Sequence, residues 1–443
     1  MTDVAIDDLP LVEEQGPSSL PLRHVAAVVV GNALEFYDFL IYSFFAVYIG
    51  RSFFPSHSAA SSLLLSLATF GAGFLTRPIG AIVIGSMGDR IGRKPAMMWS
   101  FGLMGIAIVG LPLTPSYERI GVAAPIVVLA FRLLQGFALG GEVGPTTAYL
   151  IEAAPPGRRG IYTVLQNASQ NVALLLSGLV GTLLATLLDA RQLQDWGWRV
   201  AMLIGAAIVP FGLLIRASLP ETLHTADDAA LAPDATTGSL SRMARLRPYL
   251  ALIIFGLMML ASGTIGTYVG GYMTTYALTT LHMQATAAFG VTLVKGITAM
   301  PVIVFGGWLS DRYGRKPVMI WPSLALVLSI LPVFVLVLRH PSTAVFYAGM
   351  IWLGILGSLG APSIIVALTE SFPKSIRSGA LATIYAFAIA IFGGSTQFTV
   401  TWLLDFTKDP LAPAYYWTGA ALIGLLAMVL IKESAPARTM RVG

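Results

Sequence analysis

Three basic residues lie inside long apolar stretches of the sequence, where a charge is costly. Arg132 is near the centre of the stretch 121–150, Lys295 lies about ten residues into the stretch 286–309, and Arg77 lies about eight residues from the end of a third. Each charge costs about 2.5–3.5 kcal/mol at a bilayer centre on insertion scales. The arginine fork binds a carboxylate through two hydrogen bonds, and lysine binds it as a point charge. We therefore predict that these residues bind a substrate with two or three carboxylates.

Three acidic residues in the same apolar stretches are candidates for proton coupling. Glu35 and Asp38 are three residues apart and share one helix face, and Glu142 follows Arg132 on its stretch. Burial favours a neutral carboxyl group and a nearby arginine favours its charged form. We predict that charged Asp38 or Glu35 pairs with Arg132 or Arg77, and that protonation releases the cation to the substrate. The alternative is that these residues form permanent structural ion pairs.

Uncharged polar side chains in the apolar stretches form a second set of candidate ligands. Gln166 and Gln170 share a helix face, as do Tyr268 and Tyr272. The residues predicted to bind substrate carboxylates or hydroxyl groups are Gln166, Gln170, Tyr268, Tyr272, Gln135, Asn32 and Gln397. The alternative role is hydrogen bonding between helices, which contributes about 0.6 kcal/mol per bond.

The elements that carry these residues are predicted to be transmembrane helices. The chain has 443 residues, of which 56% are hydrophobic and 11% charged, whereas soluble domains average about 25% charged residues. Many apolar runs approach the roughly 20 residues that cross a bilayer. The predicted spans are 24–50, 60–86, 96–113, 121–150, 161–189, 197–218, 248–280, 286–309, 318–338, 343–370, 377–404 and 413–432. The expected fold is an all-α polytopic membrane protein with twelve transmembrane helices.

The spans are predicted to form two halves of six helices. The expected organisation is a disordered tail 1–22, a first half 23–218, a linker 219–247, a second half 248–433 and a tail 434–443. Most Lys and Arg residues of the connections fall on the side that holds both termini, so the positive-inside rule places both termini in the cytoplasm.

The two halves repeat one another. The segment "GSMGDRIGRKP" (85–95) matches "GWLSDRYGRKP" (307–317), and Glu152 matches Glu370 at nearly the same offset. Internal repeats of this kind are typical of secondary transporters, whose substrate site lies near the midplane between the halves.

These motifs resemble those of the major facilitator superfamily. "GSMGDRIGRK" is similar to its loop between spans two and three, and "RLLQGFALGGE" to its fourth span. The segments 31–55 and 73–85 resemble the metabolite:proton symporter branch, while 161–175 and 366–394 resemble its citrate and tricarballylate carriers. Lys295 departs from the pattern of those carriers. The resemblance implies the major facilitator fold and alternating access.

The resemblance also assigns the two repeated loops to a cytoplasmic gate. The implied gate consists of Asp89, Arg90, Arg93 and Glu152 in the first half and Asp311, Arg312, Arg315 and Glu370 in the second. In each half the last of these arginines is expected to pair with the glutamate. Asp89 and Asp311 are expected at the starts of the helices that begin near Ser378 and Gly160, where the helix dipole favours a negative charge. The alternative is that the basic residues only set topology.

The predicted function is proton-coupled uptake of an organic acid, preferably citrate or a related tricarboxylate. A symporter of a dicarboxylate or an aromatic carboxylate is the alternative within transport, and a transporter-like receptor is the alternative outside it. An enzyme is not expected, because the sequence has no HExxH, GxSxG or P-loop motif. The absence of cysteine excludes thiolate metal sites.

The expected partners and location follow from this function. The partners are a small organic anion and membrane lipid, not nucleic acid, and a monomer suffices for transport. The expected coupling ion is the proton, with sodium left open, and no other cofactor is predicted. The predicted location is the plasma membrane of a bacterium, its inner membrane, with several passes.

Overall fold

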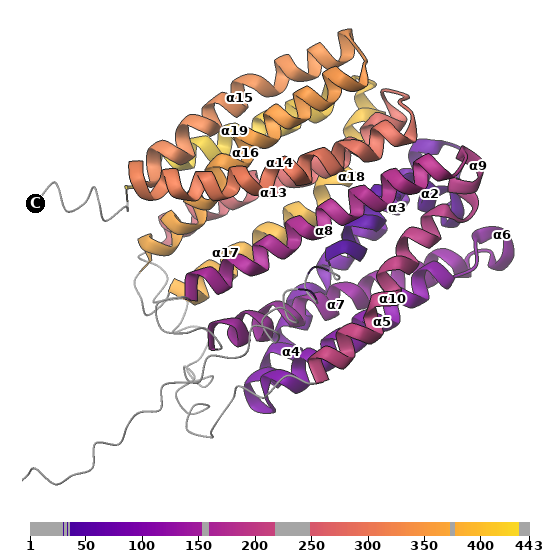
Figure 1. The fold of residues 1–443 in the computed structure, drawn as a ribbon, viewed down its shortest axis with the longest axis horizontal. Coiled ribbons are helices and arrows are strands. Elements are labelled where there is room, and N and C mark those ends of the chain that lie inside the picture. The colour runs from indigo at the N-terminus through magenta and orange to yellow at the C-terminus, as the bar shows by residue number, and fades with distance from the viewer. Residues whose placement is uncertain are drawn as a thin grey trace, which may run out of the picture.

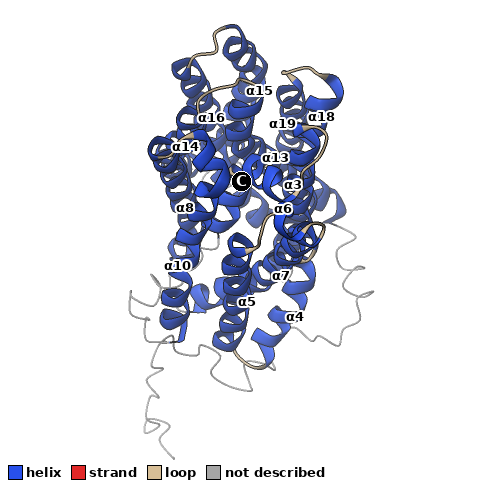
Figure 2. Cartoon of the chain, turned by 90° about the vertical axis from the view of Figure 1, so that its right-hand side faces the viewer, coloured by secondary structure: helices blue, strands red, loops and turns tan. Residues whose placement is uncertain are grey.

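The computed structural model is helical along most of the chain. It describes residues 30, 33, 36–152, 159–217, 249–372 and 377–433. Figure 2 shows helices and short connections in these ranges, and they contain no strand. The predicted all-α class is confirmed for this part of the chain.

Residues 36–44 are helical and lead into the helices of the first part of the chain. These helices are α2 (Ala46–Phe53), α3 (Ala59–Leu75), α4 (Arg77–Arg90), α5 (Arg93–Leu113), α6 (Tyr117–Ile120), α7 (Ala123–Glu152), α8 (Arg159–Leu187), α9 (Ala190–Gln192), the π-helical turn η2 (Leu193–Gly197) and α10 (Trp198–Ala217). The later helices are α13 (Leu250–Thr279), α14 (Ala285–Tyr313), α15 (Arg315–Arg339), α16 (Thr343–Ser371), α17 (Arg377–Ala388), the π-helical turn η4 (Ile389–Gly393), α18 (Gly394–Thr407) and α19 (Ala412–Leu430).

Ten segments of the described residues are long and apolar enough to cross a membrane. Helices α3 and α4 form one such segment, Ala59–Gly88, and η4 and α18 belong to another, Ile384–Thr407. The expected spans 24–50 and 197–218 are not among the ten. The first begins in residues outside the described ranges, and the second corresponds to α10. The count of twelve therefore stays a prediction.

The helices lie in two groups (Figure 1). Those coloured indigo to magenta occupy one side of the molecule, and those from α13 onward occupy the other. The groups meet where α8 packs against α14 and where α3 packs against α18 and η4. Helix α4 packs on α5 and α7, and α17 packs on α13 and α16. The contacts of α3 with α18 therefore lie at the end of these spans away from the repeated loops 85–95 and 307–317.

The repeated loops turn at a glycine in each copy. Gly92 has φ 127° and precedes α5, and Gly314 has φ 97° and precedes α15. An L-residue with a side chain rarely adopts these angles, whereas glycine does so at little steric cost. This explains why both copies of the motif carry glycine at this position.

Glycines bring the span formed by α3 and α4 into backbone contact with α7. A Cβ atom at Gly136 would overlap the carbonyl oxygen of Gly73, and one at Gly140 would overlap that of Arg77. The hydroxyl of Thr76, at the junction of α3 and α4, donates to the carbonyl oxygen of Leu133 at 2.7 Å. Small residues four apart allow this close approach of helices in a membrane. The contact places Arg77 and Arg132 in the same part of the interior.

Replacing Gly136 by alanine tests this contact. We expect Gly136→Ala to lower the thermal midpoint of the purified protein, because the new methyl group must push α7 away from α3. Overpacking of this kind costs about 1–3 kcal/mol. Gly102→Ala on α5 is the matched control, since a Cβ at Gly102 meets nothing within 4 Å. Equal midpoints for the two variants would contradict the proposed close contact.

Candidate functional site

The guanidinium of Arg132 lies among aromatic rings in the interior. Its Cζ is 4.4 Å from the ring centroid of Tyr42 and 5.0 Å from those of Phe39 and Phe70. Arg132 is 1% exposed. A desolvated cation over an aromatic face gains about 2 kcal/mol or more. The rings therefore stabilise the charge of Arg132 without neutralising it.

Arg77 lies beside this cluster. Its Cζ is 4.0 Å from the ring centroid of Phe74 and 4.9 Å from that of Phe39. Arg77 is within electrostatic range of Arg132 and of two tyrosines from the later helices, Tyr268 on α13 and Tyr385 on α17. Two like charges in this interior repel one another, and an anion between them relieves the repulsion.

Tyr385 was not predicted from the sequence. In the sequence, Tyr385 lies in an ordinary apolar run with no feature that marks it as a ligand. Only the packing of α17 brings it near Arg77. Tyr268 was predicted, and its ring meets those of Phe70 and Phe74 edge-on at 6.4 and 5.8 Å between centroids. The site thus includes side chains from both groups of helices.

A chain of hydrogen bonds links Arg132 to Asp38 through Gln135. Nη1 of Arg132 donates to Oε1 of Gln135 at 2.5 Å, and Nε2 of Gln135 donates to Oδ2 of Asp38 at 2.7 Å. Asp38 and Gln135 are 0% and 2% exposed. The sequence predicted that Asp38 or Glu35 pairs with Arg132 or Arg77, and Glu35 lies outside the described residues. In the structure the Gln135 amide lies between Asp38 and Arg132 and is hydrogen-bonded to both.

Several polar atoms of this site have no hydrogen-bond partner among the described residues. They are Oδ1 of Asp38, Nε and Nη2 of Arg132, and Nε and Nη2 of Arg77. A buried polar group without a partner costs about 1–3 kcal/mol, and more when it is charged. The four nitrogens are donors, and carboxylate oxygens accept hydrogen bonds from arginine in pairs. The arrangement suits an anion with more than one carboxylate.

Lys295 is half-buried on α14 and points at a glycine of α13. Its Nζ lies within clashing distance of where a Cβ atom at Gly270 would be, so a side chain there would displace the amine. Within the described part of the chain Lys295 forms no salt bridge. Gly270 therefore makes room for an ammonium group that lacks an acidic partner there.

Two predicted ligands are engaged in contacts between helices. The hydroxyl of Thr401 donates to that of Tyr272 at 3.0 Å. Oε1 of Gln397 accepts from Ser43 at 2.8 Å, and its Nε2 donates to the carbonyl oxygen of Tyr268 at 3.4 Å. These bonds correspond to the alternative role of such side chains, which is hydrogen bonding between helices. Their role toward a substrate stays a prediction.

Other predicted residues cannot be placed in the site. Gln170 is half-buried on α8. Asn32 and Glu35 lie outside the described residues, as do the side chains of Gln166, Glu142, Asp89, Arg93 and Glu152. Their predicted roles stand as predictions.

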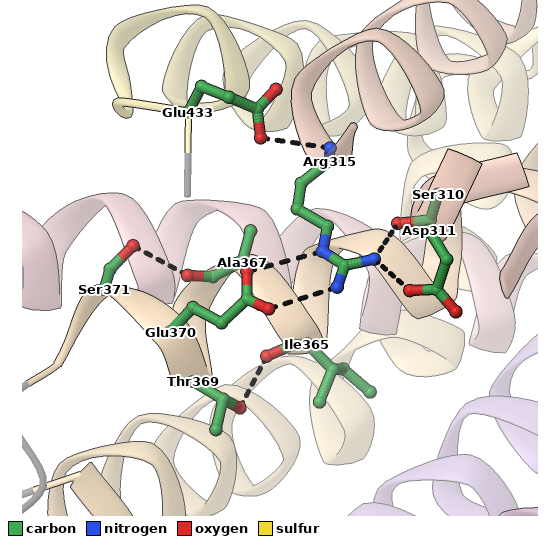
Figure 3. Close-up of polar contacts among 9 residues, drawn as sticks. All are labelled: Ser310, Asp311, Arg315, Ile365, Ala367, Thr369, Glu370, Ser371 and Glu433. Atoms are coloured by element: carbon green, nitrogen blue, oxygen red, sulfur yellow. Dashed lines mark hydrogen bonds and ion pairs between the residues drawn. The ribbon is translucent and has the colours of Figure 1, made fainter. Parts of the chain in front are cut away.

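A second cluster of charges surrounds Arg315 at the start of α15 (Figure 3). Its Nη2 and Nε contact the two carboxylate oxygens of Glu370 at 3.1 and 3.3 Å, so the predicted pair of Arg315 with Glu370 is present. Nη1 donates to Asp311 at 2.5 Å and to the hydroxyl of Ser310 at 3.0 Å. The carboxylate of Glu433 accepts from the backbone N–H of Arg315 at 3.1 Å. A carboxylate at the start of a helix is favoured by the helix dipole.

This cluster joins the ends of α14, α15 and α16 and the segment after α19. All of these elements belong to the later group of helices. The carboxylate of Asp311 is therefore bound within its own group, whereas the sequence placed it at the start of the helix near Gly160. Arg312 lies over the rings of Trp308 and Tyr313 at 5.4 and 5.8 Å, and Arg90 is exposed. The predicted role of these residues in a gate is not decided by these contacts.

The Arg315 cluster can be tested through stability. We expect Glu370→Gln to lower the thermal midpoint, because it removes the charge from a two-bonded pair whose Arg315 side chain is 11% exposed. The expected cost is on the order of 1–2 kcal/mol. Asp405→Asn is the control, because the Lys408–Asp405 pair is 74% and 42% exposed and exposed pairs contribute about 0–1 kcal/mol. A larger loss in the control than in Glu370→Gln would refute this ranking.

Comparison with known proteins identifies the family. The sequence matches the family model of the Major Facilitator Superfamily over residues 28–392 and 292–440. A citrate-proton symporter of Klebsiella pneumoniae is 37% identical over 93% of this chain and 92% of its own. A putative proline/betaine transporter of Staphylococcus aureus is 31% identical over 95% of this chain and 90% of its own. These relatives are named as transporters, in agreement with the prediction that the chain is not an enzyme.

Solved structures support the same fold. The crystal structure of a D-xylose-proton symporter superposes with a TM-score of 0.75 at 20% identity, covering 94% of this chain and 98% of that one. The inward-open xylose transporter XylE from E. coli superposes with a TM-score of 0.74 at 19% identity, covering 93% and 96%. The chain is thus a multi-pass membrane protein of this fold.

Proposed function

The chain belongs to the Major Facilitator Superfamily, and we propose that it takes up an organic acid together with a proton, preferably citrate or another tricarboxylate. The observation that carries this proposal is the pair of buried guanidiniums whose Nε and Nη2 atoms have no partner among the described residues. Similarity to citrate-proton symporters of Klebsiella pneumoniae and Salmonella typhi, at 37% and 36% identity, supports the same substrate class.

Charge balance favours a substrate with several carboxylates. Arg77 and Arg132 carry two positive charges, and Asp38 supplies one negative charge among the described groups of the site. Asp38 becomes neutral when it takes up a proton, so two cations then face the substrate. Lys295 on α14 adds a third cation to the interior of the later helices. A tricarboxylate can offset all of these charges.

Relatives at 31% identity are named as putative proline/betaine transporters, so a betaine-like substrate must be considered. The aromatic rings of this site argue against such a substrate. A quaternary ammonium group is bound by a cage of aromatic faces. Here the rings of Phe39, Tyr42 and Phe74 already face the guanidiniums of the protein itself. A further cation at these rings would meet two like charges. A dicarboxylate or an aromatic carboxylate remains the second candidate. A dicarboxylate can pair with the two arginines, and an aromatic carboxylate can use one arginine fork and a ring contact.

The proposed transport cycle follows from these contacts. Charged Asp38 holds Arg132 through Gln135, and protonation of Asp38 releases Arg132 to the substrate. The two groups of helices then move relative to one another, so that the site opens to the other side of the membrane. In the present structure α3 and α18 are in contact. We place the protein in a bacterial inner membrane as a monomer with both termini cytoplasmic.

Uptake of labelled citrate into proteoliposomes tests the proposal. We expect Arg132→Ala to reduce uptake about 100-fold, since losing a charged hydrogen-bond partner costs about 1.5–3 kcal/mol and leaves the substrate charge buried. Arg191→Ala is the control at matched protein amounts, because its side chain is 91% exposed. Unlabelled citrate should compete for uptake more strongly than succinate, benzoate, proline or betaine. Undiminished uptake by Arg132→Ala, or stronger competition by betaine than by citrate, would falsify the proposal.

The role of Lys295 can be tested without removing it. Gly270→Ala places a methyl group too close to the amine of Lys295, which must move away, and should raise the apparent KM for citrate about tenfold, which corresponds to roughly 1.4 kcal/mol. Gly263→Ala on the same helix is the control, because a Cβ at Gly263 meets nothing within 4 Å. If both variants keep the same KM as the original protein, Lys295 does not bind the substrate.

A further inference from the structure

The amide of Gln135 has a defined direction between two charged groups. Its oxygen accepts from Arg132 and its nitrogen donates to Asp38. An amide side chain has an acceptor on one arm and a donor on the other, and the two arms have the same shape. Turning the amide over therefore exchanges acceptor for donor at both ends without moving a helix.

We infer that Gln135 is the coupling residue of the symport proposed above, on which this inference rests: protonation of Asp38 inverts the Gln135 amide and thereby releases Arg132 to the substrate. Gln135 is then a positioning residue, because it acts on the substrate through Arg132.

Protonation changes what Asp38 needs from its neighbour. The charged carboxylate accepts the hydrogen bond from Nε2 of Gln135. One proton from the aqueous phase converts Oδ2 into a hydroxyl, which is a donor and needs an acceptor. The other carboxyl oxygen, Oδ1, has no hydrogen-bond partner among the described residues. The Gln135 amide is therefore the described group in contact with Asp38 that can supply the acceptor for the new hydroxyl. Inversion brings Oε1 to the new hydroxyl.

The same inversion changes what Arg132 meets. The amide nitrogen now faces Nη1, and two donors face one another without a bond. Nη1 then joins Nε and Nη2, which have no described partner, and the guanidinium presents its fork to a carboxylate. Departure of the substrate reverses the sequence: Arg132 recovers Oε1, the hydroxyl of Asp38 loses its acceptor, and its proton leaves to the aqueous phase.

Among the described groups that interact with Asp38 and the two arginines, Asp38 is the one expected to change charge near neutral pH. The described titratable or charged groups that interact with Asp38 or with the two arginines are Arg132 on α7, Arg77 on α4, Tyr268 on α13, Tyr385 on α17 and, on the helix of Asp38 itself, Tyr37 and Tyr42. Lys295 on α14 lies at Gly270 of α13 and has no such interaction with Asp38 or the arginines among the described residues. Arginine keeps its proton in proteins, and tyrosine loses one only near pH 10.

The test counts the protons that accompany citrate. Titration calorimetry of the purified full-length protein, in buffers with different ionisation enthalpies, measures proton uptake per citrate bound. We expect the original protein to take up about one proton more than Gln135→Met, which has similar length and no amide to invert. Free citrate is the same in both experiments, so the difference belongs to the protein. By linkage, one proton corresponds to about a tenfold change in affinity per pH unit.

Gln194→Met is the matched control. Nε2 of Gln194 donates to the carbonyl oxygen of Tyr48 at 3.1 Å, away from Asp38 and Arg132, so its variant should keep the proton count and the uptake rate. Gln135→Glu is the second variant. Its carboxylate stays an acceptor toward Arg132 and should weaken citrate binding at least about tenfold, about 1.4 kcal/mol.

Citrate binding by Gln135→Met with the original proton count would overturn the inference while the proposed symport stands. An original protein that binds citrate without any proton would overturn both. If Gln135→Met does not fold, infrared difference spectra of the original protein with labelled glutamine decide. A glutamine carbonyl band must shift together with protonation of Asp38 and be missing in Asp38→Asn. A spectrum without that shift overturns the inference.

Discussion

The interior of this protein is organised around the cost of keeping two guanidiniums away from water. Arg77 and Arg132 cannot become neutral, and the low dielectric of the interior strengthens both their repulsion and any attraction to an anion. Aromatic faces lower this cost without providing negative charge. The hydrogen-bonded link between Asp38 and Arg132 runs through the Gln135 amide. These charges favour an anion in the proposed site, and in the proposed cycle one proton on Asp38 strengthens that preference.

The backbone creates this situation through close helix contacts. Gly73, Gly136 and Gly140 let α7 lie directly on the span of α3 and α4. The two arginines come from different helices and share Phe39 as a neighbour only because of this contact. On α13, Gly270 makes the corresponding room for Lys295. At these positions the missing side chain of glycine lets a neighbouring group approach closely. At Gly92 and Gly314, by contrast, glycine is needed for its backbone angles.

The two charge clusters use arginine in opposite ways. Arg315 has Glu370, Asp311 and Ser310 as partners for its side chain, and it holds the ends of several helices together. Arg132 has Gln135 as its one hydrogen-bond partner among the described residues. A satisfied arginine stabilises one arrangement of the chain, whereas an unsatisfied one favours binding of a ligand.

The sequence alone determined the helical class, the repeated loops and the residues whose charge is costly in a membrane. These properties are local, because span length, glycine in a turn and an arginine in an apolar run are visible without a partner. The pairing of Arg315 with Glu370 was also predictable from the repeat. The insertion of Gln135 between Asp38 and Arg132, the proximity of Tyr385 to Arg77 and the place of Lys295 over Gly270 were not. Each depends on how helices distant in the chain are rotated and spaced against one another, and that is decided only when the whole interior packs.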